Sequence, residues 1–270
     1  MKVFPLSNKK PSRERLDKIL VEKGFFISRE KAQREIMAGT IFVDERCLDK
    51  PGTLISISSK IEIKHKTLPY VSRGGIKLEK ALREFKIDAT DKIILDIGAS
   101  TGGFTDCLLK HNAGKIYAID VGYGQIAWEL QNNPKVIIKE KINARYLKPE
   151  DFPVLFNIIV IDVSFISLTK ILIPAKNLLS GNGQIIALIK PQFEAGKNKV
   201  GKGGIISDSA THLEVIENIK QFSISSGLTP GGLIESPITG MDGNKEFFIL
   251  LMKSKRVHPR ICNSISPHQI

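Results

Sequence analysis

The chain is poor in cysteine and has no long apolar run. Its three cysteines, Cys47, Cys107 and Cys262, form no CxxC or HxxC pair, so neither a disulfide framework nor a structural zinc site is expected. The longest apolar runs, such as residues 247–252, are far shorter than the roughly 20 residues that span a bilayer. The first residues turn polar too early to form the apolar core of a signal peptide. These absences favour a cytoplasmic protein without stable membrane insertion.

The chain also has fewer acidic than basic residues. Lys and Arg number 40 against 28 Asp and Glu, which gives a formal net charge of +12. Half of this excess lies in residues 1–34, which hold ten Lys or Arg and four Asp or Glu. A strongly basic chain points to a polyanionic partner, with nucleic acid ahead of a membrane surface.

The basic N-terminal part predicts a small unit of its own. Leu16, Ile19 and Leu20 share one face of a helix over 13–24, and Ser28 is a suitable N-cap for a second helix over 29–38. Short strands are expected at 40–43, 54–57 and 61–63. Two basic helices followed by short strands make a compact α+β module.

The pattern changes after residue 72, where apolar strands alternate with helices. This order is typical of an α/β fold whose mostly parallel sheet is covered on both faces. The expected strands are 92–97, 115–120, 136–139, 156–162, 184–189 and 247–252. The expected helices are 77–85, 103–111, 124–132, 167–179 and 209–226. The predicted divisions are an extension over 1–12, the module over 13–64, a linker over 65–72, a second domain over 73–253 and a disordered tail over 254–270.

The strand over 92–97 ends in the glycine-rich turn DIGASTGG. Glycine is favoured where the backbone turns tightly and approaches a ligand closely. Asp96 precedes the turn, and Asp120 ends the next strand, where an acidic side chain can hold ribose hydroxyls. The glycine spacing is not the GxGxxG of dinucleotide enzymes, which weakens the case for an NAD-dependent oxidoreductase. A turn with purely structural glycines is the other interpretation, and the two acids favour a cofactor site.

Several segments resemble known families. DIGASTGGF followed by IDVGYGQ is similar to the S-adenosylmethionine site of class I methyltransferases. YVSRGGIKL, IDVSFISL and KPQFEAGKNKVGKGG resemble the TlyA family, hemolysin-named ribosomal RNA 2′-O-methyltransferases with an FtsJ-like domain. RLDKILVEKG and SREKAQREI resemble the alpha-L RNA-binding module of a small-subunit ribosomal protein. The resemblance covers about residues 13–253 and implies a class I Rossmann-like methyltransferase domain after the RNA-binding module.

The resemblance implies a binding site for S-adenosylmethionine. It places the glycine loop around the methionine part of the cofactor, Asp120 at the ribose and Asn143 near the adenine. Asp162 and the following residues 163–165, after the fourth strand, would close the pocket at the carboxyl edge of the sheet. The implied cofactor-binding residues are Asp96, Gly98, Ser100, Gly102, Gly103, Asp120, Asn143 and Asp162.

The resemblance also implies a catalytic tetrad and no metal requirement. Related RNA 2′-O-methyltransferases use Lys-Asp-Lys-Glu, which corresponds here to Lys77, Asp162, Lys190 and Glu246. A lysine with an ordinary pKa of about 10.4 is a poor base, but a neighbouring cation and desolvation lower that value. We assign the substrate oxygen to Lys190 and the orientation of Lys190 to Asp162. Lys77 and Glu246 would complete the charge network, although each charge taken singly also fits a surface role.

Basic side chains in two segments are candidates for contacts with RNA phosphates. Each of them is also compatible with an ordinary solvated charge. The candidates in the first module are Arg13, Arg15, Lys18, Arg29, Lys31 and Arg34. Those in the glycine-rich loop after Lys190 are Lys197, Lys199 and Lys202.

The resemblance therefore predicts an enzyme that methylates the ribose 2′-OH of a cytidine in large-subunit ribosomal RNA. Small-subunit RNA is a further target in some family members, and the expected partner is ribosomal RNA or a ribosomal subunit. Two other interpretations are a membrane-lytic hemolysin and an RNA-binding protein with an inactive methyltransferase fold. The short apolar runs argue against the first, and the acids, glycines and lysines of the motifs argue against the second.

Overall fold

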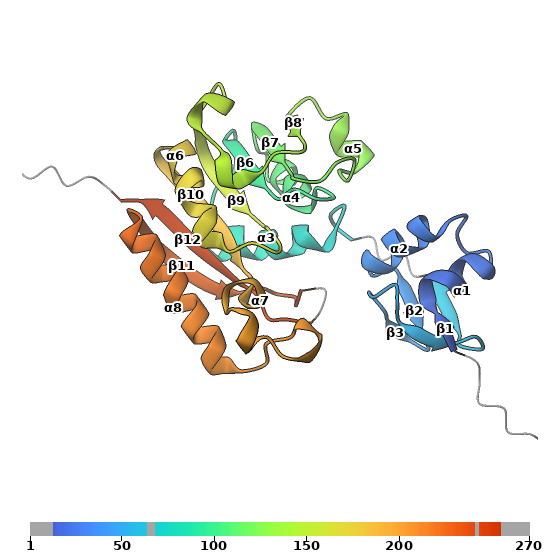
Figure 1. Cartoon of the computed structure of the whole chain (residues 1–270). Helices are drawn as coiled ribbons and strands as arrows, with labels where there is room; N and C mark the ends of the chain where they lie inside the picture. The colour runs from blue at the N-terminus through green and yellow to red at the C-terminus, as the bar shows by residue number, and fades with distance from the viewer. Residues whose placement is uncertain (1–12, 64–67, 241–242, 255–270) are drawn as a thin grey trace, which may run out of the picture.

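A smaller N-terminal unit and a larger α/β unit make up the structure, a computed structural model that describes residues 13–63, 68–240 and 243–254 (Figure 1). The predicted N-terminal extension and nearly all of the predicted tail lie outside the described residues, as do residues 65–67 of the predicted linker. The side chains of Lys197 and Lys202 are also outside them. Within the described part of the chain, none of the helices has the length and apolar character needed to cross a bilayer.

The N-terminal unit packs two helices, α1 (Leu16–Glu22) and α2 (Arg29–Met37), against small antiparallel strands. Leu16, Ile19 and Ile36 are fully buried between the helices and strand β2 (Ile41–Val43). The other strands are β1 (Arg13–Arg15), β3 (Arg46–Cys47), β4 (Leu54–Ser56) and β5 (Ile61–Ile63). This unit is the α+β module that the sequence predicts.

Both predicted helices of this unit are present, and one of them is shorter than expected. Helix α1 begins at Leu16 because the three residues before it pair with β4. Helix α2 begins where the sequence indicates, since the Ser28 hydroxyl accepts a hydrogen bond from the Lys31 backbone N–H at 3.3 Å.

The larger unit is built on a seven-stranded sheet in the order β11-β12-β10-β9-β6-β7-β8. Strands β6 to β10 run parallel, and β12 runs antiparallel to both of its neighbours. The strands are β6 (Ile93–Ile97), β7 (Lys115–Ile119), β8 (Val136–Lys139), β9 (Phe156–Ile161), β10 (Leu179–Ile189), β11 (Leu228–Glu235) and β12 (Phe247–Lys253). The predicted α/β fold with a mostly parallel sheet is confirmed.

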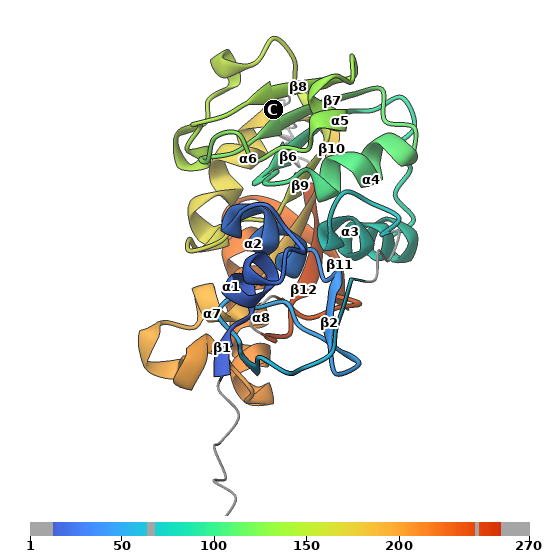
Figure 2. The ribbon, with the colours of Figure 1, turned by 90° about the vertical axis from the view of Figure 1, so that its right-hand side faces the viewer.

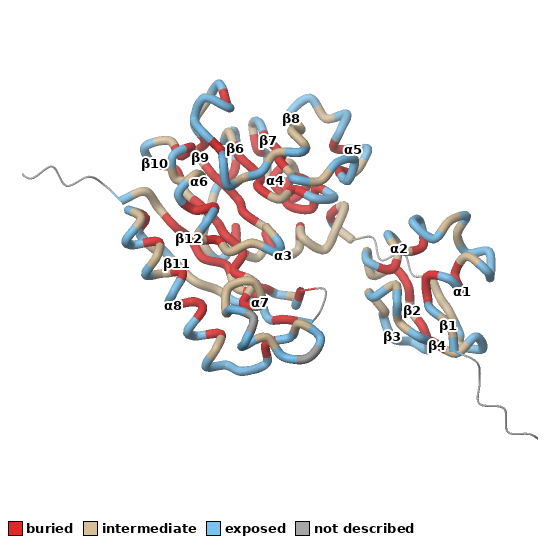
Figure 3. Tube along the Cα trace, viewed as in Figure 1, coloured by how far each residue is buried: buried red, intermediate tan, exposed pale blue. Residues whose placement is uncertain are grey.

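Helices cover both faces of this sheet, and the buried residues follow its strands (Figure 3). Helices α3 (Arg73–Glu84) and α4 (Gly103–Lys110) bury Leu78 and Phe104 against one face. Helices α6 (Leu172–Leu178) and α8 (Ser209–Ser225) bury Leu172 and Ile216 against the other. The short helical turns are α5 (Trp128–Gln131), α7 (Pro191–Glu194), η1 (Ala144–Tyr146), η2 (Pro149–Asp151), η3 (Leu168–Lys170), η4 (Lys197–Lys199) and η5 (Lys202–Gly204).

Several elements of the larger unit differ from the sequence prediction, among them β10, which begins five residues earlier than expected, and the helix over 167–179, which is divided into η3 and α6. Strand β11 is not predicted because Pro230 and its two glycines are typical of a turn; it is an edge strand, and a register shift accommodates these residues. The helix expected over 124–132 is only the single turn α5. Helix α3 starts four residues before the predicted helix and therefore includes Gly75. Packing requires glycine at this position, since a Cβ there would lie 2.2 Å from the Tyr70 ring.

Candidate active site

The carboxyl ends of the parallel strands surround a pocket of about 490 Å³. Parallel strands bring their carboxyl ends to one edge of the sheet, so the loops after β6, β7 and β9 meet there. Five of the predicted cofactor-binding residues line this pocket: Gly98, Ser100, Asp120, Asn143 and Asp162.

The turn after β6 holds the backbone close to the end of β9. Gly98 has a φ of 87°, and a Cβ there would lie 2.3 Å from the Asp162 carbonyl oxygen, so only glycine fits. Asp120 fixes the same region, because its carboxylate accepts hydrogen bonds from the backbone N–H of Ser100 at 2.8 Å and of Gly122 at 2.7 Å. Each carboxylate oxygen has a second lone pair that can accept a hydrogen bond from a ligand hydroxyl.

The other three predicted cofactor residues lie behind the pocket and do not line it. Asp96 is fully buried and accepts a hydrogen bond from the Thr105 hydroxyl of α4 at 2.6 Å. A Cβ on Gly102 would lie 2.2 Å from Leu130, and one on Gly103 would lie 2.2 Å from Ser72. These glycines therefore let the turn pack tightly against its neighbours.

The carboxyl group of Asp96 gives a prediction about stability. Burial raises its pKa to about 7, well above the ordinary value of about 3.9. Between about pH 4 and pH 7 the Asp96 carboxyl keeps its proton in the folded state but releases it in the unfolded chain. The free energy of unfolding therefore falls as the pH rises through that window. Asp96→Asn is expected to be more stable than the wild type at pH 8 and to lose that advantage at pH 5. Urea denaturation of both proteins across this range measures the difference, and a difference that stays constant with pH would contradict the assignment.

Lys190 and Asp162 form an ion pair beside the pocket, with 2.6 Å between Nζ and Oδ1. Their approach follows from the register, since Ile161 of β9 is the partner of Ala187 of β10 and both side chains come just after these strands. Lys190 also donates a hydrogen bond to the Ser164 hydroxyl at 2.9 Å. The hydrogen bond to Ser164 directs one of the three donors of the ammonium group and the Asp162 carboxylate balances its charge, so donors are left for a substrate oxygen.

Lys77 and Glu246 form a second ion pair, with 2.6 Å between Nζ and Oε2. Both side chains are buried, with 11% and 3% of their surface exposed. In the sheet, Ile189 is the partner of Phe247, so Glu246 and Lys190 are neighbours at one edge. The structure therefore brings the predicted tetrad together as two ion pairs along the carboxyl edge of the sheet.

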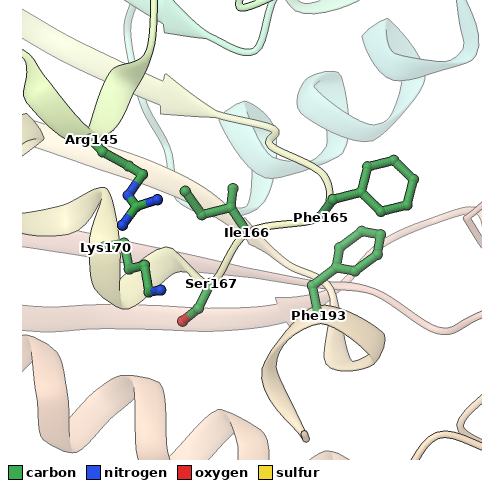
Figure 4. Close-up of a pocket in the computed structure, with 6 residues that line it drawn as sticks. All are labelled: Arg145, Phe165, Ile166, Ser167, Lys170 and Phe193. Carbon is green, nitrogen blue, oxygen red and sulfur yellow. The ribbon is translucent and has the colours of Figure 1, made fainter. Parts of the chain in front are cut away.

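A second pocket, of about 460 Å³, adjoins the first and shares Phe165 and Arg145 with it. Phe165 is 90% exposed and has a φ of 63°, a rare conformation for a bulky residue. Its ring centroid lies 5.0 Å from that of Phe193. Figure 4 shows the two rings together on one side of the pocket, with Arg145 and Lys170 on the other. An aromatic surface opposite two cations can hold a planar, phosphate-bearing ligand.

Sequence reasoning missed two of the polar groups around these pockets, Arg145 and Lys170, and gave no separate role to a third, Ser164. Ser164 carries a signal that could have been used, because it lies two residues beyond Asp162 in a loop that must reach the same edge. Arg145 and Lys170 carry no such signal, since they come from the short turns η1 and η3, whose approach depends on the packing of the whole domain.

In the N-terminal unit, a buried carboxylate organises two of the predicted RNA-binding residues. Asp17 has no exposed surface and accepts hydrogen bonds from Arg15 Nε at 3.0 Å, Arg29 at 2.9 Å and Gln33 at 2.8 Å. The hydrogen bond from Arg15 is the largest of the effects that hold the pKa of Asp17 well below its usual range. The two guanidinium groups are about half exposed, so their outer edges stay available for another anion.

The other predicted RNA-binding residues are arranged less tightly. Lys18 pairs with Glu14 at 2.7 Å, and Lys199 pairs with Glu214 at 2.6 Å, so both already have an acidic partner. Arg13, Lys31 and Arg34 are exposed. The side chains of Lys197 and Lys202 lie outside the described residues.

Comparison with known proteins assigns both units. Residues 70–253 match the FtsJ-like methyltransferase family, and residues 14–61 match the S4 domain. The chain belongs to the FtsJ-like methyltransferase family. The S4 match covers the unit that carries Asp17 and its two arginines, and the methyltransferase match covers both pockets and both ion pairs.

Three proteins that resemble this chain over most of its length support the family assignment. "Putative rRNA methyltransferase YqxC" of Bacillus subtilis (strain 168) is 50% identical, with 88% of this chain and 85% of that protein covered. The "16S/23S rRNA (cytidine-2'-O)-methyltransferase TlyA" of Mycobacterium tuberculosis (strain ATCC 25618 / H37Rv) is 39% identical, with 88% and 90% covered. A solved structure, "Putative hemolysin from Streptococcus thermophilus", has a TM-score of 0.71 at 43% identity and covers 91% of this chain and 90% of that one. The resemblance seen in the sequence motifs is therefore confirmed.

Proposed function

We propose that this methyltransferase transfers a methyl group from S-adenosylmethionine to the ribose 2′-OH of a cytidine in ribosomal RNA. The observation that carries the proposal is the arrangement of two ion pairs, Lys190–Asp162 and Lys77–Glu246, beside the pocket that contains Asp120. The name of the Mycobacterium tuberculosis relative describes the same reaction. The S4 domain offers the half-exposed guanidinium groups of Arg15 and Arg29 to the RNA.

The larger pocket fits S-adenosylmethionine. Gly98 allows a ligand to approach the backbone, and Asp120 can accept hydrogen bonds from both hydroxyls of a ribose. Val121 lines the pocket although 73% of its surface is exposed, which suits contact with the flat face of an adenine. The bound cofactor supplies an electrophilic methyl group, and the remaining task of the protein is to position and deprotonate the hydroxyl.

Lys190 is the residue that meets the substrate oxygen. Its ammonium is held by the ion pair with Asp162 and the hydrogen bond to Ser164, so a free donor can hold the 2′-oxygen in line with the methyl group. In the proposed reaction Lys190 first releases one ammonium proton to solvent and then accepts the proton of the hydroxyl as the oxygen attacks, and Asp162 stabilises the ammonium that forms again. The ion pair between Lys77 and Glu246 joins helix α3 to the start of strand β12 beside this pair.

The smaller pocket is the place for the target nucleotide. Sequence-specific recognition of RNA mostly uses nucleotides whose bases are unstacked, so we expect the target nucleotide to be displaced from its stack. Phe165 projects into solvent and can stack on the displaced base, while Arg145 and Lys170 can contact the phosphates beside it. This arrangement would place the ribose between Phe165 and Lys190.

The decisive experiment uses radiolabelled S-adenosylmethionine and purified ribosomal subunits that lack the modification. The expected result is labelled 2′-O-methylcytidine at a defined position, mapped by nuclease digestion and mass spectrometry. Separate reactions with each subunit determine the range of substrates. Cofactor binding without any label in either subunit would contradict the proposed substrate.

Binding of RNA by the S4 domain is expected to depend steeply on salt, because contacts with phosphates release counterions. Arg15→Gln together with Arg29→Gln should weaken the binding and reduce the slope of log K against log[salt] by about 1.5 to 2. Lys92→Gln together with Lys115→Gln is the matched control, since these exposed lysines flank the amino ends of β6 and β7, away from the pocket. Filter binding between low and physiological salt measures both, and an unchanged slope in the arginine variant would argue against these contacts.

A further inference from the structure

Besides Phe165, three aromatic side chains are strongly exposed in the loops that adjoin the cofactor pocket. The exposed fraction is 74% for Trp128, 73% for Tyr123 and 68% for Tyr146. The chain has one Trp and four Tyr in total, and the remaining two, Tyr70 and Tyr117, are buried. Tyr and Trp normally bury most of their surface, so a set of three that does not is a feature to be explained by a partner. We refer to Tyr123, Trp128 and Tyr146 as the aromatic rim.

The aromatic rim is built from two loops that are joined to each other. The Lys141 N–H donates to the Gly122 carbonyl at 3.1 Å, which ties the loop after β8 to the loop after β7. Other residues of the same loops, Gln125 and Arg145, line the cofactor pocket. Helix α5, which carries Trp128, lies on the side of the larger unit that faces the S4 domain (Figures 1 and 2). RNA held by the S4 domain with its target ribose at the pocket would therefore pass over this rim.

Cations are interleaved with these rings. Lys141 Nζ lies 4.6 Å from the centroid of the Tyr123 ring, and Arg145 lies 5.7 Å from that of Tyr146. Residues 139–148 contain four Lys or Arg and one acid, Glu140, whose carboxylate accepts a hydrogen bond from the Gly124 N–H at 2.7 Å. Aromatic rings beside cations are the combination that binds unpaired nucleotides, because bases stack on the rings while phosphates meet the charges.

We infer that the aromatic rim binds unpaired bases that flank the target nucleotide, with Lys141 and Arg145 at the adjoining phosphates. The inference deepens the proposed function, on which it rests for the identity of the partner as RNA. The target base itself belongs in the smaller pocket with Phe165, so the rim holds its neighbours in the strand. It follows that the enzyme prefers a target in a loop or an opened helix to one in a continuous duplex.

Trp128 makes the inference directly measurable, because it is the single tryptophan of the chain. Stacking of a base on an exposed indole is expected to quench its fluorescence and to protect it from acrylamide. The full-length wild type is titrated with a short unpaired RNA and with the same strand in a duplex, and the unpaired strand should quench more strongly. Unchanged fluorescence with both RNAs would overturn the inference. A fluorescence change that depends on protein concentration alone would also overturn it, because the aromatic rim would then bind a second copy of the chain.

Variants separate stacking from a general effect on the fold. Trp128→Ala is expected to weaken binding of unpaired RNA about tenfold, and Trp128→Phe, which keeps a ring, should restore most of it. Both should bind S-adenosylmethionine like the wild type. Leu213→Ala is the control, since Leu213 is 68% exposed on α8 and lies in a different part of the sheet unit. Wild-type RNA affinity in Trp128→Ala would overturn the inference.

The same proteins distinguish this inference from the proposed function. Methylation of ribosomal RNA by the wild type, with no loss in Trp128→Ala, would leave the proposed function in place and remove the role of the rim. Quenching by unpaired RNA and weaker binding in Trp128→Ala, without methylation of any ribosomal RNA, would support the rim and overturn the proposed reaction.

Discussion

Replacing Lys190 with alanine is expected to lower the rate of methyl transfer by about a hundredfold or more, with cofactor binding unchanged. In the proposed reaction Lys190, held by its contacts with Asp162 and Ser164, meets the substrate oxygen. Loss of a positioned general base typically costs about 10²- to 10⁴-fold in rate, and loss of alignment adds to it. Single-turnover incorporation of labelled methyl groups measures the rate of the chemical step, and calorimetry measures the cofactor affinity.

Two further variants show which property of Lys190 matters. Lys190→Arg keeps the positive charge but has a group that does not lose its proton, so it should be nearly as inactive as Lys190→Ala if proton transfer is required. Ser164→Ala removes one contact that orients the ammonium and keeps the ion pair, so a smaller loss of rate is expected. Substantial activity in Lys190→Arg would show that charge alone suffices, and full activity in Lys190→Ala would contradict the assignment.

The sequence predicts those parts of the site that follow directly from the order of the elements. Asp120, Asp162 and Lys190 each come immediately after a strand of a parallel sheet, so the order of strands and helices alone predicts that they meet at one edge. The family resemblance then supplies Lys77 and Glu246, whose positions on a helix and an antiparallel strand could not be deduced from spacing. In the structure, Lys77, Asp162, Lys190 and Glu246 all lie at this edge as two ion pairs.

Other features depend on contacts between segments whose approach the sequence does not reveal. The number of basic residues near the N-terminus suggests that their side chains are free. In the structure the buried Asp17 carboxylate accepts hydrogen bonds from two of them, Arg15 and Arg29. The glycine motif suggests that every glycine faces the ligand, but Gly102 and Gly103 serve packing against Leu130 and Ser72. In both cases local pattern indicates the type of site, and tertiary packing decides which residues reach it.

The buried pair Lys77–Glu246 should contribute strongly to stability when either partner is removed alone. Its side chains are 11% and 3% exposed, so Glu246→Leu leaves an uncompensated buried ammonium and Lys77→Met an uncompensated buried carboxylate. Each single change is expected to lower the free energy of unfolding by about 3–5 kcal/mol. The double variant should be more stable than either single one, because two apolar side chains replace two buried charges.

The exposed pair Lys199–Glu214 is the control for this cycle. Its side chains are 44% and 52% exposed, so Lys199→Met and Glu214→Leu should each change the free energy of unfolding by less than about 1 kcal/mol. Urea denaturation of the four single and two double variants gives both coupling energies. If the buried pair behaves like the exposed one, its carboxylate and ammonium are reached by water and the stabilising role is wrong. The Lys77→Met/Glu246→Leu protein restores the packing but leaves the Lys190–Asp162 pair without its charged neighbours. If this protein recovers stability but not methyl transfer, the Lys77–Glu246 pair is needed for catalysis independently of the fold.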